Sequence, residues 1–208
     1  MKHDKYITGL SVESLKNLTV KIDRLRALFV LSTHTAVGRK RLSSVLDVGE
    51  GYVRNIISGL KTDGLVREDR SGNFLTTKGK MAMKSVSDYL VPYFGFRAAG
   101  FVNSKAVLVK GNSGHIKMGV EERDAAIRMG ATGALIITCN HGSFWFPGLA
   151  NLSEDNPALV EAIRRHMAPE ENDVIIISWG KSPKDSERGA LNAAIEILEK
   201  AGKDRALI

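Results

Sequence analysis

The side chains best suited to bind a polyanion lie in the first half of this 208-residue sequence. Val53, Ile56 and Leu60 recur at helical spacing, so the segment around them is predicted to be an amphipathic helix. The opposite face of that helix carries Arg54 and Asn55 beside small residues. Because arginine binds guanine bidentately and asparagine binds adenine, this face is suited to reading base edges in a DNA groove. A solvated helix face is the simpler alternative.

A second group of basic side chains precedes this helix. Arg39, Lys40 and Arg41 fall in the first turn of a short predicted helix, where the helix dipole makes exposed cations unfavourable by roughly 0.3–1 kcal/mol each. A bound phosphate would offset that cost through the side chains and the free backbone N–H groups. The complete set of predicted DNA-binding residues is Arg39, Lys40, Arg41, Glu50, Tyr52, Arg54, Asn55, Ser58, Lys61, Arg67, Arg70, Asn73 and Lys78.

The second half offers weaker evidence for chemistry. Cys139 and His141 follow directly on a predicted strand, and such a pair could bind a transition metal or act as nucleophile and base. A buried cysteine with surface histidines is the simpler interpretation, because no second matched pair accompanies them. The sequence also holds no phosphate loop of Walker or Rossmann type. We therefore predict no metal, no cofactor and no catalytic residue.

Small-molecule binding is the use that we predict for the polar and aromatic side chains of the second half. They fall in turns and at strand ends, and an aromatic ring beside a few polar groups suits a pocket. Core packing explains Trp145 and Trp179 equally well. The predicted ligand-binding residues are Asn112, Ser113, His115, Lys117, Cys139, His141, Trp145, Lys181 and Ser182.

The elements that would position the basic residues follow a familiar order. The periodicity predicts helices over 20–31, 39–46 and 50–63, a β-hairpin with strands 65–69 and 74–76 around a turn at 70–73, and a fourth helix from Thr77 to near Pro92. Helix, helix, helix, hairpin, helix is the order of a winged helix-turn-helix domain. In that geometry the third helix enters the major groove and the hairpin reaches a neighbouring backbone.

Three stretches carry a resemblance to a DNA-binding family. They are Gly38–Leu46 (GRKRLSSVL), Tyr52–Lys61 (YVRNIISGLK) followed by Gly64-Leu65-Val66, and Gly72–Gly79 (GNFLTTKG). The first half resembles the DNA-binding domain of the repressor of central glycolytic genes, which implies a winged helix that binds double-stranded DNA. Gly49 departs from that family, which tends to have a serine N-cap; glycine weakens such a cap by only about a few tenths of a kcal/mol.

The second half reads as an alternation of strands and helices. Strands are predicted at 105–110, 134–139, 142–147 and 173–179, and helices at 120–129, 156–167 and 186–201. This β-α-β-β-α-β-α order predicts a ferredoxin-like βαββαβ domain with one extra helix, and a small doubly wound sheet is the alternative. The half also resembles an uncharacterised domain that follows a winged helix in certain archaeal regulator-type proteins, a resemblance that implies no chemistry.

Composition and charge agree with a two-domain α+β protein, with domains predicted at 1–92 and 100–208. Apolar residues make up 43% of the chain and charged residues 25%, which is ordinary globular composition. The net charge is +7; residues 1–95 hold all of this excess, and residues 96–208 are balanced. The longest apolar runs fall far short of the roughly 20 residues that span a bilayer. With one cysteine and no recognisable signal segment, the chain is expected to be cytoplasmic.

These observations predict a DNA-binding transcriptional regulator whose second half senses a small ligand or mediates dimerisation. The expected partners are double-stranded DNA and a small-molecule effector, with no membrane and a homodimeric assembly. Met83, Val86 and Leu90 on the fourth helix form either a pairing surface or a face packed within the chain. The alternative function is an enzyme whose second half is catalytic, with Cys139 or His141 in the chemistry and the basic half as a nucleic-acid tether.

Overall fold

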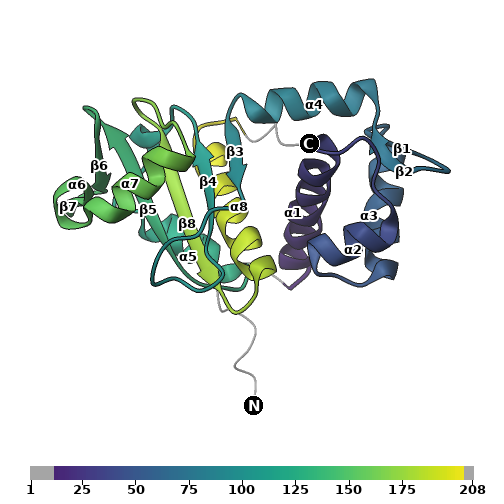
Figure 1. Ribbon diagram of the computed structural model, residues 1–208, viewed down its shortest axis with the longest axis horizontal. Coiled ribbons are helices and arrows are strands. Elements are labelled where there is room, and N and C mark those ends of the chain that lie inside the picture. The colour runs from purple at the N-terminus through teal and green to yellow at the C-terminus, as the bar shows by residue number, and fades with distance from the viewer. Residues whose placement is uncertain (1–11, 204–208) are drawn as a thin grey trace, which may run out of the picture. The chain divides into compact units, whose positions relative to one another are not determined.

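A computed structural model describes residues 12–203 (Figure 1). Contacts within the chain divide it into two units, with the boundary between Ser85 and Val86. Helices and antiparallel strands occur in both units, so the predicted α+β class and two-domain organisation are confirmed. None of the helices in the part of the chain that the structure describes is long and apolar enough to cross a membrane.

The first unit has the predicted order of three helices, a hairpin and a fourth helix. Its elements are α1 (Val12–Ser32), α2 (Arg39–Leu46), α3 (Glu50–Thr62), β1 (Val66–Asp69), β2 (Gly72–Leu75) and α4 (Thr77–Ser87). The apolar stripe predicted for α3 is confirmed, because Val53, Ile56, Ile57 and Leu60 are all buried. Ile22 and Leu28 of α1 complete this core with Leu42 of α2.

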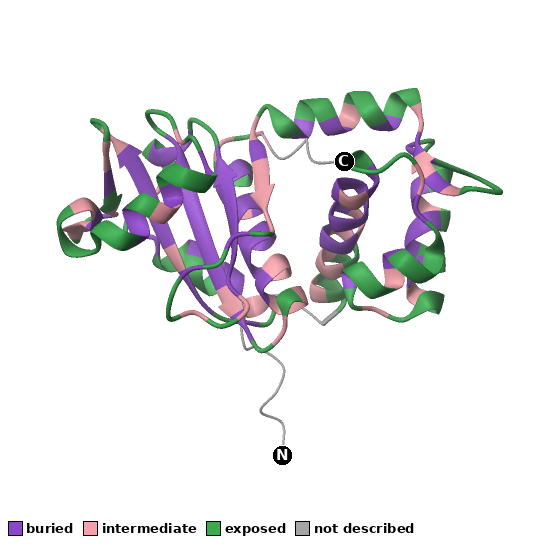
Figure 2. Cartoon of the chain, viewed as in Figure 1, coloured by how far each residue is buried: buried purple, intermediate pink, exposed green. Residues whose placement is uncertain are grey.

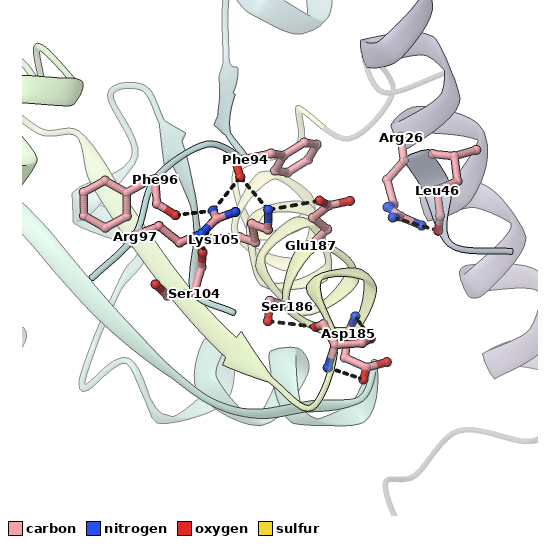
Figure 3. Close-up of polar contacts among 11 residues, drawn as sticks. Arg26, Leu46, Phe94, Phe96, Arg97, Ser104, Lys105, Asp185, Ser186 and Glu187 are labelled. Carbon is pink, nitrogen blue, oxygen red and sulfur yellow. Dashed lines mark hydrogen bonds and ion pairs between the residues drawn. The ribbon is translucent and has the colours of Figure 1, made fainter. Parts of the chain in front are cut away.

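An arginine lies inside this helical unit. Arg26 of α1 is 1% exposed, and its guanidinium donates to the Asp23 carboxylate at 2.9 Å. It also donates to the carbonyl oxygen of Leu46 at 3.1 Å (Figure 3). Leu46 is the last residue of α2, where backbone carbonyls lack helical partners. Arg26 therefore attaches α1 to the end of α2, a role that no sequence pattern predicted.

The hairpin is joined to the segment that precedes α2. Val37 and Asn73 form a β-bridge, and Asn73 also donates its side-chain amide to the Val37 carbonyl oxygen at 3.0 Å. Asn73 is fully buried, so its predicted role in DNA binding is wrong. Gly72, expected in the turn, starts β2 with φ +132°, and a Cβ there would lie 2.9 Å from the Val37 carbonyl carbon. Glycine is required because the two backbones approach so closely.

The fourth helix is shorter than predicted. It ends at Ser87, and Leu90–Tyr93 forms strand β3, which belongs to the second unit rather than to a first domain ending at 92. Proline disfavours a helical conformation of the residue before it and is tolerated in an edge strand, which accounts for this difference at Pro92. Met83, Val86 and Leu90 are buried within a single chain, so they are not a surface free to pair two chains.

The second unit contains an antiparallel sheet with strand order β3-β4-β8-β5-β6-β7. After β3 its elements are β4 (Lys105–Val109), a 3₁₀ turn (Ser113–His115), α5 (Val120–Arg128), β5 (Ala131–Asn140), β6 (Ser143–Phe146), β7 (Ala150–Asn151), α6 (Leu152–Asp155), α7 (Pro157–His166), β8 (Val174–Gly180) and α8 (Pro183–Lys200). The strands at the centre are buried along almost their whole length, as Figure 2 shows for β4, β5 and β8. Such continuous burial requires cover on both faces of the sheet.

Successive residues of β8 point to different helical layers. Ile175 and Ile177 join one apolar cluster with Leu159 and Ile163 of α7. On the other face, the hydroxyl of Ser178 lies against Gly189 of α8. The predicted order of strands and helices along the chain is present, but the arrangement in space differs from a ferredoxin-like sheet, which carries its helices on one face only. The most apolar strands, β8 and β5, occupy central positions because both of their faces are covered.

Candidate functional site

The exposed face of α3 carries the side chains predicted to read DNA. Glu50, Arg54, Asn55 and Ser58 are all exposed, opposite the buried stripe. Tyr52 differs, because its side chain is only partly exposed. The helix begins after Gly49, whose lack of a side chain leaves the first-turn N–H groups without a side-chain cap. Several side chains on this face are short, so another surface can come close to the helix backbone.

The basic start of α2 lies beside the hairpin. Arg39, Lys40 and Arg41 occupy the first turn of α2, and all three are exposed. The helix follows Gly38, which provides no side-chain cap. A Cβ on Gly72 would lie 3.1 Å from the Gly38 backbone nitrogen, so the hairpin and the helix start are in direct contact. The structure therefore brings the two predicted phosphate-binding regions together.

The hairpin tip presents Arg70 to solvent. Asp69 accepts hydrogen bonds from the backbone N–H and the hydroxyl of Ser71, which closes a tight turn around Arg70. These hydrogen bonds, the hydroxyl first, lower the pKa of the Asp69 carboxyl below its usual value. The carboxylate is thus used within the turn and does not pair with Arg70.

Several of the other predicted DNA-binding cations have partners inside the first unit. Lys61 pairs with Glu68 at 3.1 Å, and the Arg67 guanidinium lies 4.3 Å from the centre of the Phe74 ring. Lys78 donates to the carbonyl oxygen of Asp63 at 2.8 Å, at the end of α3. That contact satisfies a carbonyl at a helix C-terminus, so the structure gives Lys78 a structural role in the unit. Arg41 lies 3.4 Å from the His34 ring.

Four predicted DNA-binding cations have no such partner. Within residues 12–203, the side chains of Arg39, Lys40, Arg54 and Arg70 form no ion pair or hydrogen bond, and each is exposed. We call these four residues the unpaired basic group. They come from the start of α2, the exposed face of α3 and the hairpin tip. An unpaired cation keeps its full charge available for an external anion.

The predicted ligand-binding residues divide into separate groups in the second unit. Ser113, Lys117 and Trp145 line one open cavity of about 410 Å³. Thr138 and Asn140 of β5 also line it, and neither was predicted, because Thr138 lies within an apolar run and Asn140 is the polar residue that ends the strand. The remaining lining residues come from the position after the 3₁₀ turn, from the facing ends of β6 and β7, and from the loop between these strands: Ile116, Phe146, Pro147, Gly148, Leu149 and Ala150.

Hydrogen bonds join three of the residues that line this cavity. The Ser113 hydroxyl donates to Asn140 Oδ1 at 3.0 Å, and the Ser113 N–H donates to the Asn172 carbonyl oxygen at 2.8 Å. Trp145 Nε1 donates to the carbonyl oxygen of Asn140 at 3.3 Å. These contacts fix the indole ring beside the end of β5.

The structure gives the cysteine and the two histidines different surroundings. Cys139 is buried in the apolar cluster under α7, and burial raises the pKa of its thiol, with Glu171 and Asp173 adding to the shift. A thiol kept protonated is a poor nucleophile and metal ligand. His141 is exposed in the β5–β6 turn, and His115 is exposed and does not line the cavity. Within residues 12–203, no cluster of three His, Cys, Asp or Glu side chains could hold a metal ion.

Other predicted ligand residues have structural roles. Ser182 caps α8 in a reciprocal pair with Asp185. β5 pairs Ala131 with Gly180, so Lys181 and Ser182 lie at the opposite end of β5 from Asn140 and the cavity. Asn112 is buried and accepts a hydrogen bond from Lys203 at 3.2 Å. None of these three residues lines the cavity, so their predicted ligand-binding role is not supported by position.

Two family models match separate parts of the chain. Residues 22–81 match "PH0730-like, N-terminal domain", and residues 102–197 match "Domain of unknown function (DUF4443)". Among solved structures, the chain is similar to "Hypothetical protein PH0730 from Pyrococcus horikoshii OT3", with 26% identity and a TM-score of 0.72. That match covers 90% of this chain and 98% of the other. A search of curated proteins finds no significant match.

The comparisons extend the sequence analysis in one respect. The first half is similar to the N-terminal domain of PH0730-like proteins, and the archaeal structure shares the fold of the chain across both units. The names of these relatives state no activity, ligand or partner. The resemblance to the glycolytic-gene repressor stays a prediction.

Proposed function

We propose that the chain is a DNA-binding transcriptional regulator of the winged-helix type. In this proposal α3 enters the major groove, where Arg54 and Asn55 contact base edges. The observation that carries the proposal is the unpaired basic group, whose four side chains are exposed, together with the small and polar side chains on the exposed face of α3. Base contacts supply sequence preference in such a complex, and phosphate contacts fix its register.

Phosphate contacts come from the other two elements in this arrangement. Arg39 and Lys40 stand on an uncapped helix start, where free N–H groups and the positive end of the dipole attract an anion. The hairpin tip carries Arg70 toward the adjoining backbone, as the wing does in related geometries. Contact between Gly72 and Gly38 supports their joint action, because it joins the hairpin to the start of α2.

The second unit acts as a small-ligand sensor in this proposal, and two copies of the chain bind a twofold operator. Paired recognition helices would contact half-sites about one helical turn of DNA apart. Support for the sensor comes from the cavity, which brings Ser113, Lys117 and Trp145 together beside Asn140. No surface of the single chain is assigned to the pairing of two copies.

Selection of bound fragments from genomic DNA tests the proposal. Purified full-length chain is incubated with sheared DNA of its source at moderate salt, and the retained fragments are sequenced. We expect one enriched motif with twofold symmetry, bound at least about 1,000-fold more tightly than a scrambled duplex at equal salt. Retention of all fragments alike, or of none, would contradict a regulator that reads base sequence.

A further inference from the structure

The cavity of the second unit has a composition that selects a class of ligand. From its lining we infer that it binds a small planar molecule carrying one anionic group, with the ring on Trp145 and the anion at Lys117. This inference rests on the proposed sensor role of the unit and names the chemistry of its effector. The volume of about 410 Å³ lies within the range of small-molecule sites, about 300–1,000 Å³.

Charge favours an anion in this cavity. Lys117 is its one ionisable lining residue, and no carboxylate is among the described residues that line it. Glu121 is near enough to interact electrostatically with Lys117, but its carboxylate accepts a hydrogen bond from Lys200. Lys200 also bonds to Glu122, so these acids are held in a separate network. Within residues 12–203 the Lys117 ammonium makes no ion pair or hydrogen bond.

The second polar group at the cavity is the side-chain amide of Asn140. Its Oδ1 atom accepts a hydrogen bond from the Ser113 hydroxyl, so the amide oxygen is used within the protein. In the described part of the chain the Nδ2 group has no hydrogen-bond partner, so it can donate to a ligand. Lys117 and Asn140 therefore both offer donors, and a carboxylate or phosphate supplies the acceptors that they require.

The apolar residues that line the cavity indicate which kind of group the uncharged part of the ligand carries. Trp145 is 38% exposed although its Nε1 group is hydrogen-bonded to Asn140, so its ring is held in place and remains open to contact. Leu149, 76% exposed, and Phe146 line the same cavity. A fixed indole with neighbouring apolar side chains favours a flat ring, because stacking adds to the area that is removed from water.

Calorimetric titration of the full chain tests this ligand class. Indoleacetate provides an aromatic carboxylate and adenosine monophosphate provides a purine phosphate, so the two probes distinguish the source of the anion. Tryptamine is the matched control, because it keeps the indole ring and reverses the charge. We expect saturable binding of at least one anionic probe, at least about tenfold tighter than that of tryptamine.

Variants locate the binding. Lys117→Gln and Trp145→Leu, both at exposed side chains, should each lower the affinity for the probe at least about tenfold. Lys181→Gln, at the far end of the sheet, should change this affinity less than about twofold. No saturable binding of either anion, equal binding of tryptamine, or equal effects of all three variants would overturn the inference.

Duplex binding of the same proteins separates the two proposals. Lys117→Gln should bind a selected duplex as the unchanged chain does when no probe is present, because Lys117 lies outside the unpaired basic group. If the chain binds an anionic probe but no DNA sequence, the ligand class stands and the regulator function fails. If it binds DNA with sequence preference and neither anion, the ligand class fails alone.

Discussion

The two units differ in how they use basic side chains. In the second unit two poorly exposed cations have acidic partners: Arg128 pairs with Glu196, and Lys105 lies 3.5 Å from Glu187 while donating to the Phe94 carbonyl oxygen at 2.6 Å (Figure 3). In the first unit the unpaired basic group stands free on the surface. Net charge follows the same division, +7 for residues 1–95 and zero for residues 96–208.

This contrast separates cations that stabilise the fold from cations that are available to a partner. A buried or half-buried charge must be compensated by a hydrogen-bonded counter-charge, and Arg26 of the first unit obeys the same rule with Asp23. Exposed unpaired cations contribute little to stability. The proposed polyanion-binding surface rests on the accumulation of such cations on three elements of the first unit.

The largest expected effect is on the buried cation. Arg26→Ala removes the guanidinium that donates to the buried Asp23 carboxylate and to the Leu46 carbonyl oxygen, so the free energy of unfolding of the first unit should fall by about 3–5 kcal/mol. Far-UV circular dichroism during urea denaturation measures it, because α-helices dominate this unit. Arg24→Ala is the control on the same helix; its pair with Asp63 is partly exposed, so the loss should stay below about 1 kcal/mol. Equal losses would remove the distinction between the two classes of cation.

The next effect is on sequence preference. Arg54→Ala should cost about 1–3 kcal/mol on a selected duplex and relax the preference at one base pair, while leaving the free energy of unfolding unchanged. Fluorescence anisotropy with single-base variants of the duplex measures this. Arg123→Ala in the second unit, where Asp124 is the partner, serves as the control and should not alter DNA affinity. A silent Arg54→Ala would refute the groove-reading role of α3.

A third effect concerns salt. Arg39→Ala and Arg70→Ala should each weaken selected and scrambled duplexes alike, and each should reduce the slope of log affinity against log salt by about 1. The reason is that a phosphate contact releases counterions whatever the base sequence. Titrations at several salt concentrations measure the slope. Loss of affinity for the selected duplex alone would show that these residues read bases.

The smallest effect is expected from an exposed acid of the second unit. The hydrogen bond from Lys200 lowers the pKa of the Glu121 carboxyl, so its contribution to stability is present above the unfolded pKa and is lost as pH falls through the folded value. Glu121→Gln should therefore lower the unfolding midpoint slightly at neutral pH and not at all in strong acid. Thermal melts at several acidic pH values measure the difference in unfolding midpoint between the variant and the unchanged chain. If this difference grew toward low pH, the pairing of Glu121 with Lys200 would be contradicted.

Periodicity predicted much of the fold because it records which residues are buried. The spacing of Val53, Ile56, Ile57 and Leu60 predicted α3, and the apolar run Ile175–Ile177 predicted β8. Strand neighbours are decided by contacts between distant segments, so the position of β8 between β4 and β5 could not be predicted. The strand at Leu90–Tyr93 was missed because its first residues continue the helical pattern of α4.

The candidate sites were predictable to different extents. Exposure of Arg54 follows from helix geometry alone, so the exposed face of α3 could be derived from one segment. The burial of Asn73 depends on Val37, a residue far away in the chain, and no local signal indicates that bridge. Likewise, Lys117 and Trp145 meet at one cavity only after β5 and β6 pair.

Hydrogen–deuterium exchange of the full chain, with and without a selected duplex, tests the central claim most directly. The account predicts new protection in Arg39–Ser58 and in the hairpin around Arg70, with residues 105–200 unchanged. Protection confined to the second unit, or none at a saturating duplex concentration, would contradict the assignment of the DNA-binding surface to the first unit.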